Sequence, residues 1–241
     1  MIEIVNTIII ISLIIIIYKY FEKTSYDVVM VKSNVNGRQY LVRNLPDKQE
    51  AADLLGKIAV KLQKLVDVVN NMGYEAIYNK YLKADVMKET EVKVKDKDTI
   101  QGESGGSSES QLLEKDVKKK LKEDVERLVN NYNPDALSES TPDAKYTSYS
   151  INKGEKIVFC MRDKGNTEQI VKENIMTFVA IHELAHVMNK TIGHDFSYWN
   201  TFKLLLKLAI DNSLYKNIDF NNNPQPYCGI NITDSPLKDR N

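Results

Sequence analysis

The chain has 241 residues, and 33 Lys and Arg balance 33 Asp and Glu, so the formal net charge is zero. This balance argues against a dedicated nucleic-acid-binding protein, which usually carries a basic surplus. A hydrophobic content of 42% and a charged content of 27% exclude wholesale disorder. Two cysteines are too few for a disulfide framework, which indicates a compartment where thiols stay reduced or do not matter.

Residues 1–24 predict an N-terminal transmembrane anchor. Ile4–Tyr18 contains no charged residue, and with its flanks it approaches the roughly 17–25 residues that a spanning helix needs. A cleaved signal peptide fits less well, because Glu3 precedes the run and no small-residue cleavage site follows it. Lys19 and Lys23 follow the run, so the positive-inside rule predicts a single-pass protein with a cytoplasmic C-terminal domain.

Residues 25–87 predict a β-hairpin followed by a helix. Val28–Lys32 and Gln39–Val42 are short β-prone runs. They flank Asn36-Gly37, which is the strongest short hairpin signal.

The helix is expected to begin after Asp47, which with Glu50 forms an acidic version of the capping box. Gly73 is a plausible end, although the chain after it could add another turn or two. Apolar residues at helical spacing predict one buried face, formed by Leu54, Leu55, Ile58, Leu62, Leu65, Val66 and Val69.

Residues 88–110 predict a flexible linker, because charges alternate along it and a Gly-Gly-Ser-Ser run follows. Residues 111–241 then form the predicted core, beginning with an amphipathic helix over Gln111–Asn130. Acidic residues surround the lysine run at 118–120, so a solvated helix face is favoured over a nucleic-acid patch.

Tyr146–Ile151 and Lys156–Met161 predict a second hairpin with Asn152-Lys153-Gly154 at its turn. The Lys156–Met161 strand is a candidate edge against which an extended substrate could pair. Cys160, on this strand, is expected in the core.

Two further helices are expected, over Thr167–Lys190 and over about Phe196–Asp211. Asn166, with Gln169 three residues on, is the predicted cap of the first.

All three histidines of the chain lie between positions 182 and 194, and two of them form an H-E-x-x-H sequence over residues 182–186. Residues i and i+4 lie one turn apart on one helix face, so His182 and His186 can bind the same metal ion. Glu183 sits about 100° round the helix, where its carboxylate can reach a water at the metal without binding the metal. The surrounding helix is apolar nearly all round, and a cation would offset the cost of burying these groups.

A catalytic zinc takes three protein ligands and a water, whereas a structural zinc takes four protein ligands. No glutamate follows Glu183, and the metzincin spacing would need histidine where the chain has Ile192. His194 is therefore the predicted third ligand, because Gly193 allows a sharp exit from the helix. Asp195 is a second candidate, although capping of the next helix is favoured for it.

Two residues near the C-terminus are weaker candidates for a role in the metal site. Tyr227 could hydrogen-bond a developing oxyanion, although packing near a turn is the favoured interpretation. Cys228 could be a fourth zinc ligand that silences the site.

The segment 178–186, the pair Gly193-His194 and the pair Tyr198-Trp199 together resemble the WLM-type metallopeptidases, which are zincins related to the SprT/Spartan proteases. The chain looks most similar to the membrane-anchored forms encoded by large double-stranded DNA viruses, and blocks at 37–48 and 227–236 share the likeness. Tyr198 stands where Phe is expected, and this aromatic pair is expected to pack rather than react.

The resemblance implies an α+β, zincin-like fold with a small antiparallel sheet and a central H-E-x-x-H helix. It also implies one catalytic Zn²⁺ bound by His182, His186 and His194, with Glu183 as the catalytic acid and base.

The sequence therefore predicts a zinc-dependent metalloendopeptidase, anchored in a viral or host membrane, that acts on protein or peptide substrates. The alternative is a membrane-anchored structural or adaptor protein with a structural metal site, which a fourth protein ligand would indicate. Cellular relatives cleave proteins crosslinked to DNA, but that substrate is not expected here because the chain has no basic surplus.

Overall fold

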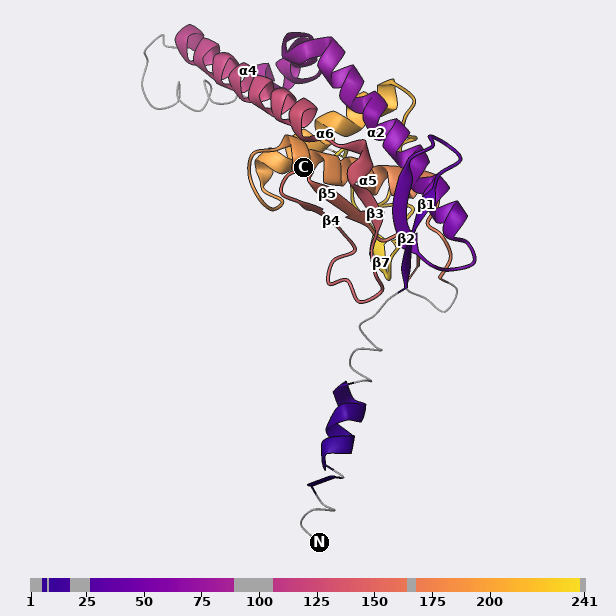
Figure 1. The fold of residues 1–241 in the computed structure, drawn as a ribbon. Coiled ribbons are helices and arrows are strands. Elements are labelled where there is room, and N and C mark those ends of the chain that lie inside the picture. Colours follow the sequence, from indigo (N-terminus) through magenta and orange to yellow (C-terminus); the bar gives the residue numbers. More distant parts are fainter. Residues whose placement is uncertain (1–5, 8, 18–26, 89–105, 164–167, 239–241) are drawn as a thin grey trace.

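The computed structural model describes residues 6–7, 9–17, 27–88, 106–163 and 168–238 (Figure 1). Within these residues the fold is α+β, with one five-stranded mixed sheet, one two-stranded sheet and several long helices. The α+β class therefore agrees with the expectation from the sequence.

The N-terminal segment is helical over residues 6–7 and 9–17. In the part of the chain that the structure describes, no helix is both long enough and apolar enough to cross a membrane. The prediction of a transmembrane helix over residues 1–24 is therefore wrong for residues 6–7 and 9–17. The other residues of that segment lie outside the part of the chain that the structure describes. The single-pass localisation with a cytoplasmic domain depended on that helix and is corrected with it.

The larger sheet contains five strands in the order β1-β2-β3-β5-β4. These strands are β1 (Val28–Lys32), β2 (Gln39–Arg43), β3 (Leu137–Glu139), β4 (Ser148–Ile151) and β5 (Lys156–Phe159). The two hairpins β1-β2 and β4-β5 are antiparallel, as their turn sequences predicted.

The antiparallel sheet implied by the family resemblance is wrong, because β3 pairs in parallel with both β2 and β5. Parallel neighbours need a long crossover connection. Here the chain between β2 and β3 includes the helices α2 (Lys48–Ile77) and α4 (Gly106–Asn131). Strand β3 therefore joins the two hairpins, although it lies far along the chain from β2.

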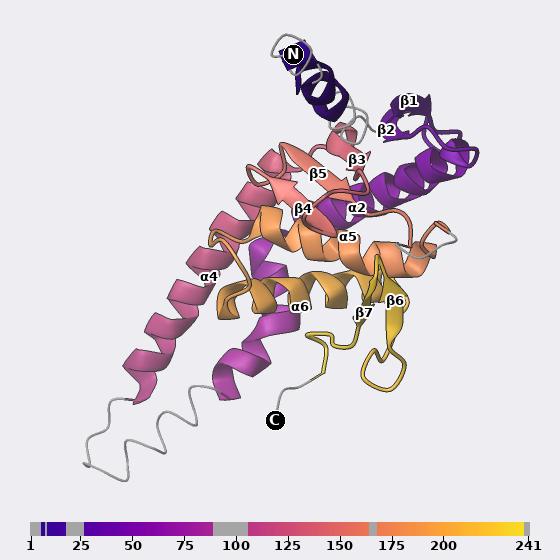
Figure 2. The same cartoon turned by 90° about the horizontal axis from the view of Figure 1, so that it is seen from below.

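The helices form a layer against the sheet, and α5 lies between the strands and α6 (Figure 2). Helix α5 packs against α2, α4, α6 and strand β4. The helical elements are α2 (Lys48–Ile77), η1 (Tyr78–Leu82), α4 (Gly106–Asn131), the short η2 (Pro134–Ala136), α5 (Glu173–Met188) and α6 (Phe196–Asp211).

Helix α2 follows the predicted apolar spacing, and all seven residues expected on its inner face are buried. The chain breaks helical geometry at Gly73, with φ of 67° and ψ of 163°, and then continues as helix, so this glycine bends the helix without ending it. Asp47 occupies the N-cap position but makes no capping hydrogen bond. Its carboxylate instead forms an ion pair with Arg162, so the predicted capping box is wrong.

Helix α4 begins at Gly106 and not at Gln111, so the end of the predicted linker is helical. Residue 88 is also helical, and residues 89–105 lie outside the described part of the chain. Helices therefore extend into both ends of the predicted linker, and the linker itself stays a prediction.

Helix α5 begins at Glu173, several residues later than predicted. The preceding residues extend along the sheet, where Ile170 forms a bridge with Arg162 and the N–H of Val171 donates to the carbonyl of Met161 at 2.9 Å. The predicted cap at Asn166 lies outside the described residues.

Strands β6 (Gln225–Tyr227) and β7 (Ile230–Ile232) form the two-stranded sheet. A disulfide joins Cys228, in the turn between them, to Cys160, the residue after β5, with a Cα–Cα distance of 6.2 Å. The inference of reduced thiols from the cysteine count is therefore not supported, because both cysteines of the chain are paired.

Candidate metal centre

Helix α5 places His182 and His186 one turn apart on one face, as their spacing requires. The helix is buried nearly all round by the elements packed against it. His182 and His186 are half-buried, while His194 reaches the same place from the exposed segment between α5 and α6.

The three imidazole rings converge. The Nε2 atom of His194 lies 3.2 Å from Nε2 of His186 and 3.1 Å from Nε2 of His182. One ligand atom from each residue lies within 4.8 Å of the other two. The structure thus brings together the three histidines that the sequence singled out.

The spacing of these nitrogens fits a shared cation better than a set of hydrogen bonds. A ring nitrogen carries either one hydrogen or one in-plane lone pair, so Nε2 of His194 can form one good hydrogen bond and not two. Nitrogens bound to a tetrahedral zinc at about 2.0–2.1 Å lie about 3.4 Å apart. The observed 3.1 and 3.2 Å are close to that value.

Burial keeps the rings in the form that binds metals. It lowers the pKa of His182 to about 3 and the pKa of His186 to about 4, and it also lowers the pKa of His194. A neutral imidazole offers the free lone pair that a metal ligand needs.

Glu183 is 3% exposed, and among the described residues its Oε2 atom has no hydrogen-bond partner. Burial raises the pKa of this carboxyl to about 8. A buried carboxylate without a partner is costly unless a nearby cation or water compensates it. This orphaned oxygen, next in sequence to His182, is a second observation that fits a cation site.

Tyr198, on α6, lies against all three rings. Its ring centroid is 4.2 Å from that of His186, 4.7 Å from that of His194 and 5.3 Å from that of His182. Its hydroxyl donates to the backbone carbonyl of His182 at 3.2 Å. The side chain is fully buried, in line with the packing role expected for it.

The segment that carries His194 leaves α5 as the sequence suggested. Gly193 has φ of 87°, in the left-handed region that glycine adopts without strain. Asp195 caps α6, because its side chain accepts a hydrogen bond from the N–H of Tyr198 at 2.8 Å. Asp195 is not part of the group of converging ligand atoms, so the capping interpretation is the one the geometry supports.

The two C-terminal candidates have other partners. Cys228 is bonded to Cys160 and offers no thiolate, so the prediction of a fourth ligand there is wrong. Tyr227 is 3% exposed and shares a hydrogen bond with the hydroxyl of Ser148 on β4. Burial raises the pKa of Tyr227, and the nearby charge of Glu183 adds to this effect. Its role towards an oxyanion stays a prediction.

The edge of the sheet beside α5 is β4, whereas the strand predicted as the edge, β5, lies between β3 and β4. Sequence reasoning missed this because strand order depends on pairing between distant segments. Nor does the sequence reveal that Ser148 hydrogen-bonds Tyr227, or that Lys153 contacts the chain at the end of α5, because no motif surrounds these residues.

Comparisons with known proteins identify viral relatives. Protein R325 of Acanthamoeba polyphaga mimivirus, described as uncharacterized, is 31% identical over 235 residues that cover 98% of each chain. The uncharacterized proteins 136R of Invertebrate iridescent virus 6 and 042R of Invertebrate iridescent virus 3 match 28% of this chain over 69 residues. Their identities are 36% and 38%, and the match covers 38% and 42% of those proteins.

No family model matches the chain, and no solved structure does. The match to R325 extends over nearly the whole of both chains. The chain therefore belongs to the same family as protein R325 of Acanthamoeba polyphaga mimivirus.

Proposed function

We propose that the chain is a zinc-dependent metalloendopeptidase of the WLM type, which hydrolyses peptide bonds. The observation that carries this proposal is the convergence of three imidazoles, together with the burial of Glu183, next in sequence to His182, whose Oε2 atom has no hydrogen-bond partner among the described residues. In the described part of the chain, no fourth His, Cys, Asp or Glu joins the three histidines. Three ligands are the number that a catalytic zinc takes, and this favours the peptidase over an adaptor with a structural metal.

His182, His186 and His194 would hold the ion. When bound, a zinc ion lowers the pKa of a water molecule towards about 7 and polarises the scissile carbonyl. Glu183 then accepts a proton from the attacking water and passes it to the leaving amine. Burial raises the pKa of this carboxyl, and the positive charge of a bound zinc ion would lower it again, so that the carboxylate is ionised and can accept the proton.

Strand β4 is the element best placed to bind an extended peptide. It pairs with β5 on one side and is the last strand of its sheet on the other. Unpaired backbone groups on an edge strand can hydrogen-bond an added strand. Because α5 packs against β4, a peptide on that edge would run beside the helix that carries His182, Glu183 and His186.

The test is metal analysis together with peptide cleavage, carried out on the full chain. We expect one zinc per chain in both the wild type and Glu183→Gln, because the carboxylate is not a ligand. Cleavage of unstructured peptides should fall at least about 100-fold in Glu183→Gln, the usual contribution of a general base. A zinc chelator should abolish cleavage by the wild type.

Glu173→Gln is the matched control, because Glu173 lies at the far end of the same helix and pairs with Lys61 and Lys57. It should cleave peptides like the wild type. Full activity of Glu183→Gln, or a wild-type preparation that binds no zinc, would refute the proposal.

A further inference from the structure

His194 lies on a segment that has little packing of its own. Residues 190–196 are exposed, and Ile192 is 92% exposed. The segment is neither helix nor strand between the end of α5 and the start of α6. Apart from the contact between the rings of His194 and Tyr198, apolar burial contributes little to the path of this segment, so its polar contacts matter more.

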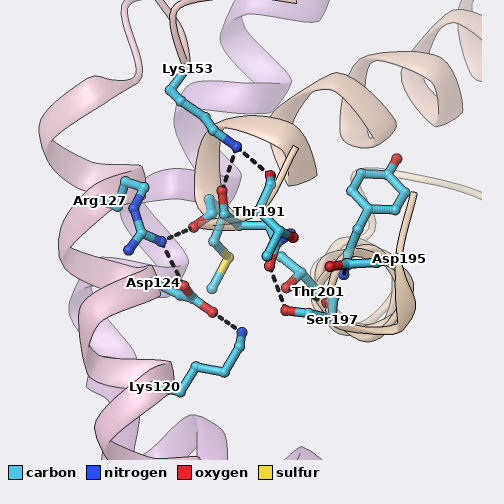
Figure 3. A network of polar contacts seen from close by, with 11 residues as sticks. Lys120, Asp124, Arg127, Lys153, Thr191, Asp195, Ser197 and Thr201 are labelled. Atoms are coloured by element: carbon cyan, nitrogen blue, oxygen red, sulfur yellow. Dashed lines mark hydrogen bonds and ion pairs between the residues drawn. The ribbon is translucent and has the colours of Figure 1, made fainter. Parts of the chain in front are cut away.

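The side chain of Lys153 makes such contacts. Its Nζ atom donates to the carbonyl of Asn189 at 2.8 Å and to the carbonyl of Thr191 at 2.6 Å. Figure 3 shows the ammonium group reaching both carbonyls from the turn between β4 and β5. These two carbonyls lie where the chain leaves α5 and turns towards His194.

The turn that carries Lys153 has an unusual backbone. Asn152, Lys153 and Gly154 have φ of 46°, 58° and 114°, in a region that glycine and asparagine tolerate but lysine rarely adopts. A Cβ atom on Gly154 would lie 2.6 Å from the carbonyl oxygen of Asn131 and 3.2 Å from a methyl of Val187. The turn is thus held tightly against the ends of α4 and α5, which aims the lysine at the carbonyls.

A second cation supports the same helix end. Arg127, on α4, donates to the carbonyl of Met188 at 2.7 Å. Its guanidinium is held by Asp124 at 2.6 Å, and Asp124 is 2% exposed and also pairs with Lys120 (Figure 3). Cations stabilise the last carbonyls of a helix because these groups lack partners within the helix.

Asn189 joins the segment to the next helix. Its side-chain amide donates to the hydroxyl of Thr191, and its side-chain oxygen accepts from the hydroxyl of Ser197 at 2.7 Å. The residue is fully buried. The start of the segment is thereby held by Lys153 in the β4–β5 turn, by Arg127 on α4 and by Ser197 on α6.

We propose that Lys153 is a positioning residue for the metal centre, because it holds the carbonyls of Asn189 and Thr191 and thereby keeps His194 at ligand distance from His182 and His186. Arg127 supports it by holding the end of α5. This inference rests on the proposed function, since it assumes that the three histidines bind zinc.

The test measures zinc affinity by competition with a chromophoric chelator, using the full chain. Lys153→Met should weaken zinc binding about tenfold or more, the usual effect of losing a group that orients a ligand. Lys153→Arg should recover most of the affinity, because a guanidinium can also donate to two carbonyls. Lys156→Met, which removes the same charge from the exposed start of β5 in the same hairpin, should leave the affinity unchanged.

A double-mutant cycle separates positioning from general destabilisation. If Lys153 acts through His194, Lys153→Met should have no further effect on zinc affinity in a His194→Ala background. Equal losses in both backgrounds would overturn the inference. If Lys153→Met does not fold, Lys153→Gln, which keeps a polar amide but loses the charge, replaces it in the same cycle.

The outcomes distinguish this inference from the proposed function. A wild type that binds no zinc overturns both. A wild type that binds zinc, with Lys153→Met equal to it in affinity, overturns the role of Lys153 alone.

Discussion

The phenol ring of Tyr198 stacks on the imidazole of His186, with ring centroids 4.2 Å apart and planes 25° apart. The same side chain holds the backbone of His182 through its hydroxyl. One residue of α6 thus contacts two histidines of α5 in different ways. These two contacts can be separated by substitution.

Tyr198→Phe keeps the ring and loses only the hydrogen bond to His182. We expect a loss of about 1 kcal/mol in the free energy of unfolding and little change in zinc affinity. Tyr198→Leu also removes the stacked ring, so we expect a larger loss of about 2–4 kcal/mol and clearly weaker zinc binding. Urea unfolding and chelator competition would measure both, and equal zinc affinities of the two variants would show that the stack does not orient His186.

Gly154→Ala should destabilise the fold, because the new Cβ would lie 2.6 Å from the carbonyl oxygen of Asn131 in a backbone with φ of 114°. We expect a loss of about 1–3 kcal/mol in the free energy of unfolding, measured in urea. Gly73→Ala is the matched control, since Gly73 also has positive φ but, apart from its own neighbours in the helix, no described atom lies within 4 Å of its added Cβ. A larger loss for Gly73→Ala than for Gly154→Ala would contradict this account.

The Cys160–Cys228 disulfide spans 68 positions of the sequence. Closing a loop of this length stabilises a protein by about 4 kcal/mol in the chain-entropy description. Cys160→Ser should therefore lower the free energy of unfolding by about that amount, and a reductant should do the same to the wild type. The double variant Cys160→Ser/Cys228→Ser should match the single variant, and two free thiols in the folded, unreduced wild type would disprove the pairing.

Asp47 makes the free energy of unfolding depend on pH in the acidic range. Its hydrogen bond with Arg162 holds the pKa of Asp47 below its usual value. A carboxylate with a lowered pKa in the folded state stabilises that state above its unfolded pKa, of about 4, and loses this effect as the pH falls through the folded pKa.

The difference in stability between the wild type and Asp47→Asn should therefore be present at pH 7 and shrink below about pH 4. We expect only about 0.5–1 kcal/mol at pH 7, because the Asp47 side chain is 36% exposed. Urea unfolding across this pH range would measure it. A difference that grows towards acid pH would show that the ion pair is not the cause.

The features that the sequence predicted well depend on near neighbours in the chain. The Asn36-Gly37 and Asn152-Lys153-Gly154 turns set their hairpins locally, and the apolar spacing of α2 follows from its own residues. The convergence of the histidines was also foreseeable, because His182 and His186 share one helix turn and His194 follows closely.

The features that the sequence did not reveal involve distant partners. Asp47 looked like a helix cap, but Arg162, 115 positions away, binds its carboxylate instead. The parallel pairing of β3, the disulfide and the contacts of Lys153 with the end of α5 likewise join segments far apart. Local patterns do not encode these pairings, because they form only once the chain has folded.

The disulfide has one more consequence for a proposed protease. It closes a covalent ring that contains α5, α6 and all three histidines. A single backbone cut within this ring, whether by another protease or by a second copy of the chain, would leave both fragments joined. Such a nicked molecule would migrate as one species on a denaturing gel and separate into two only after a reductant is added.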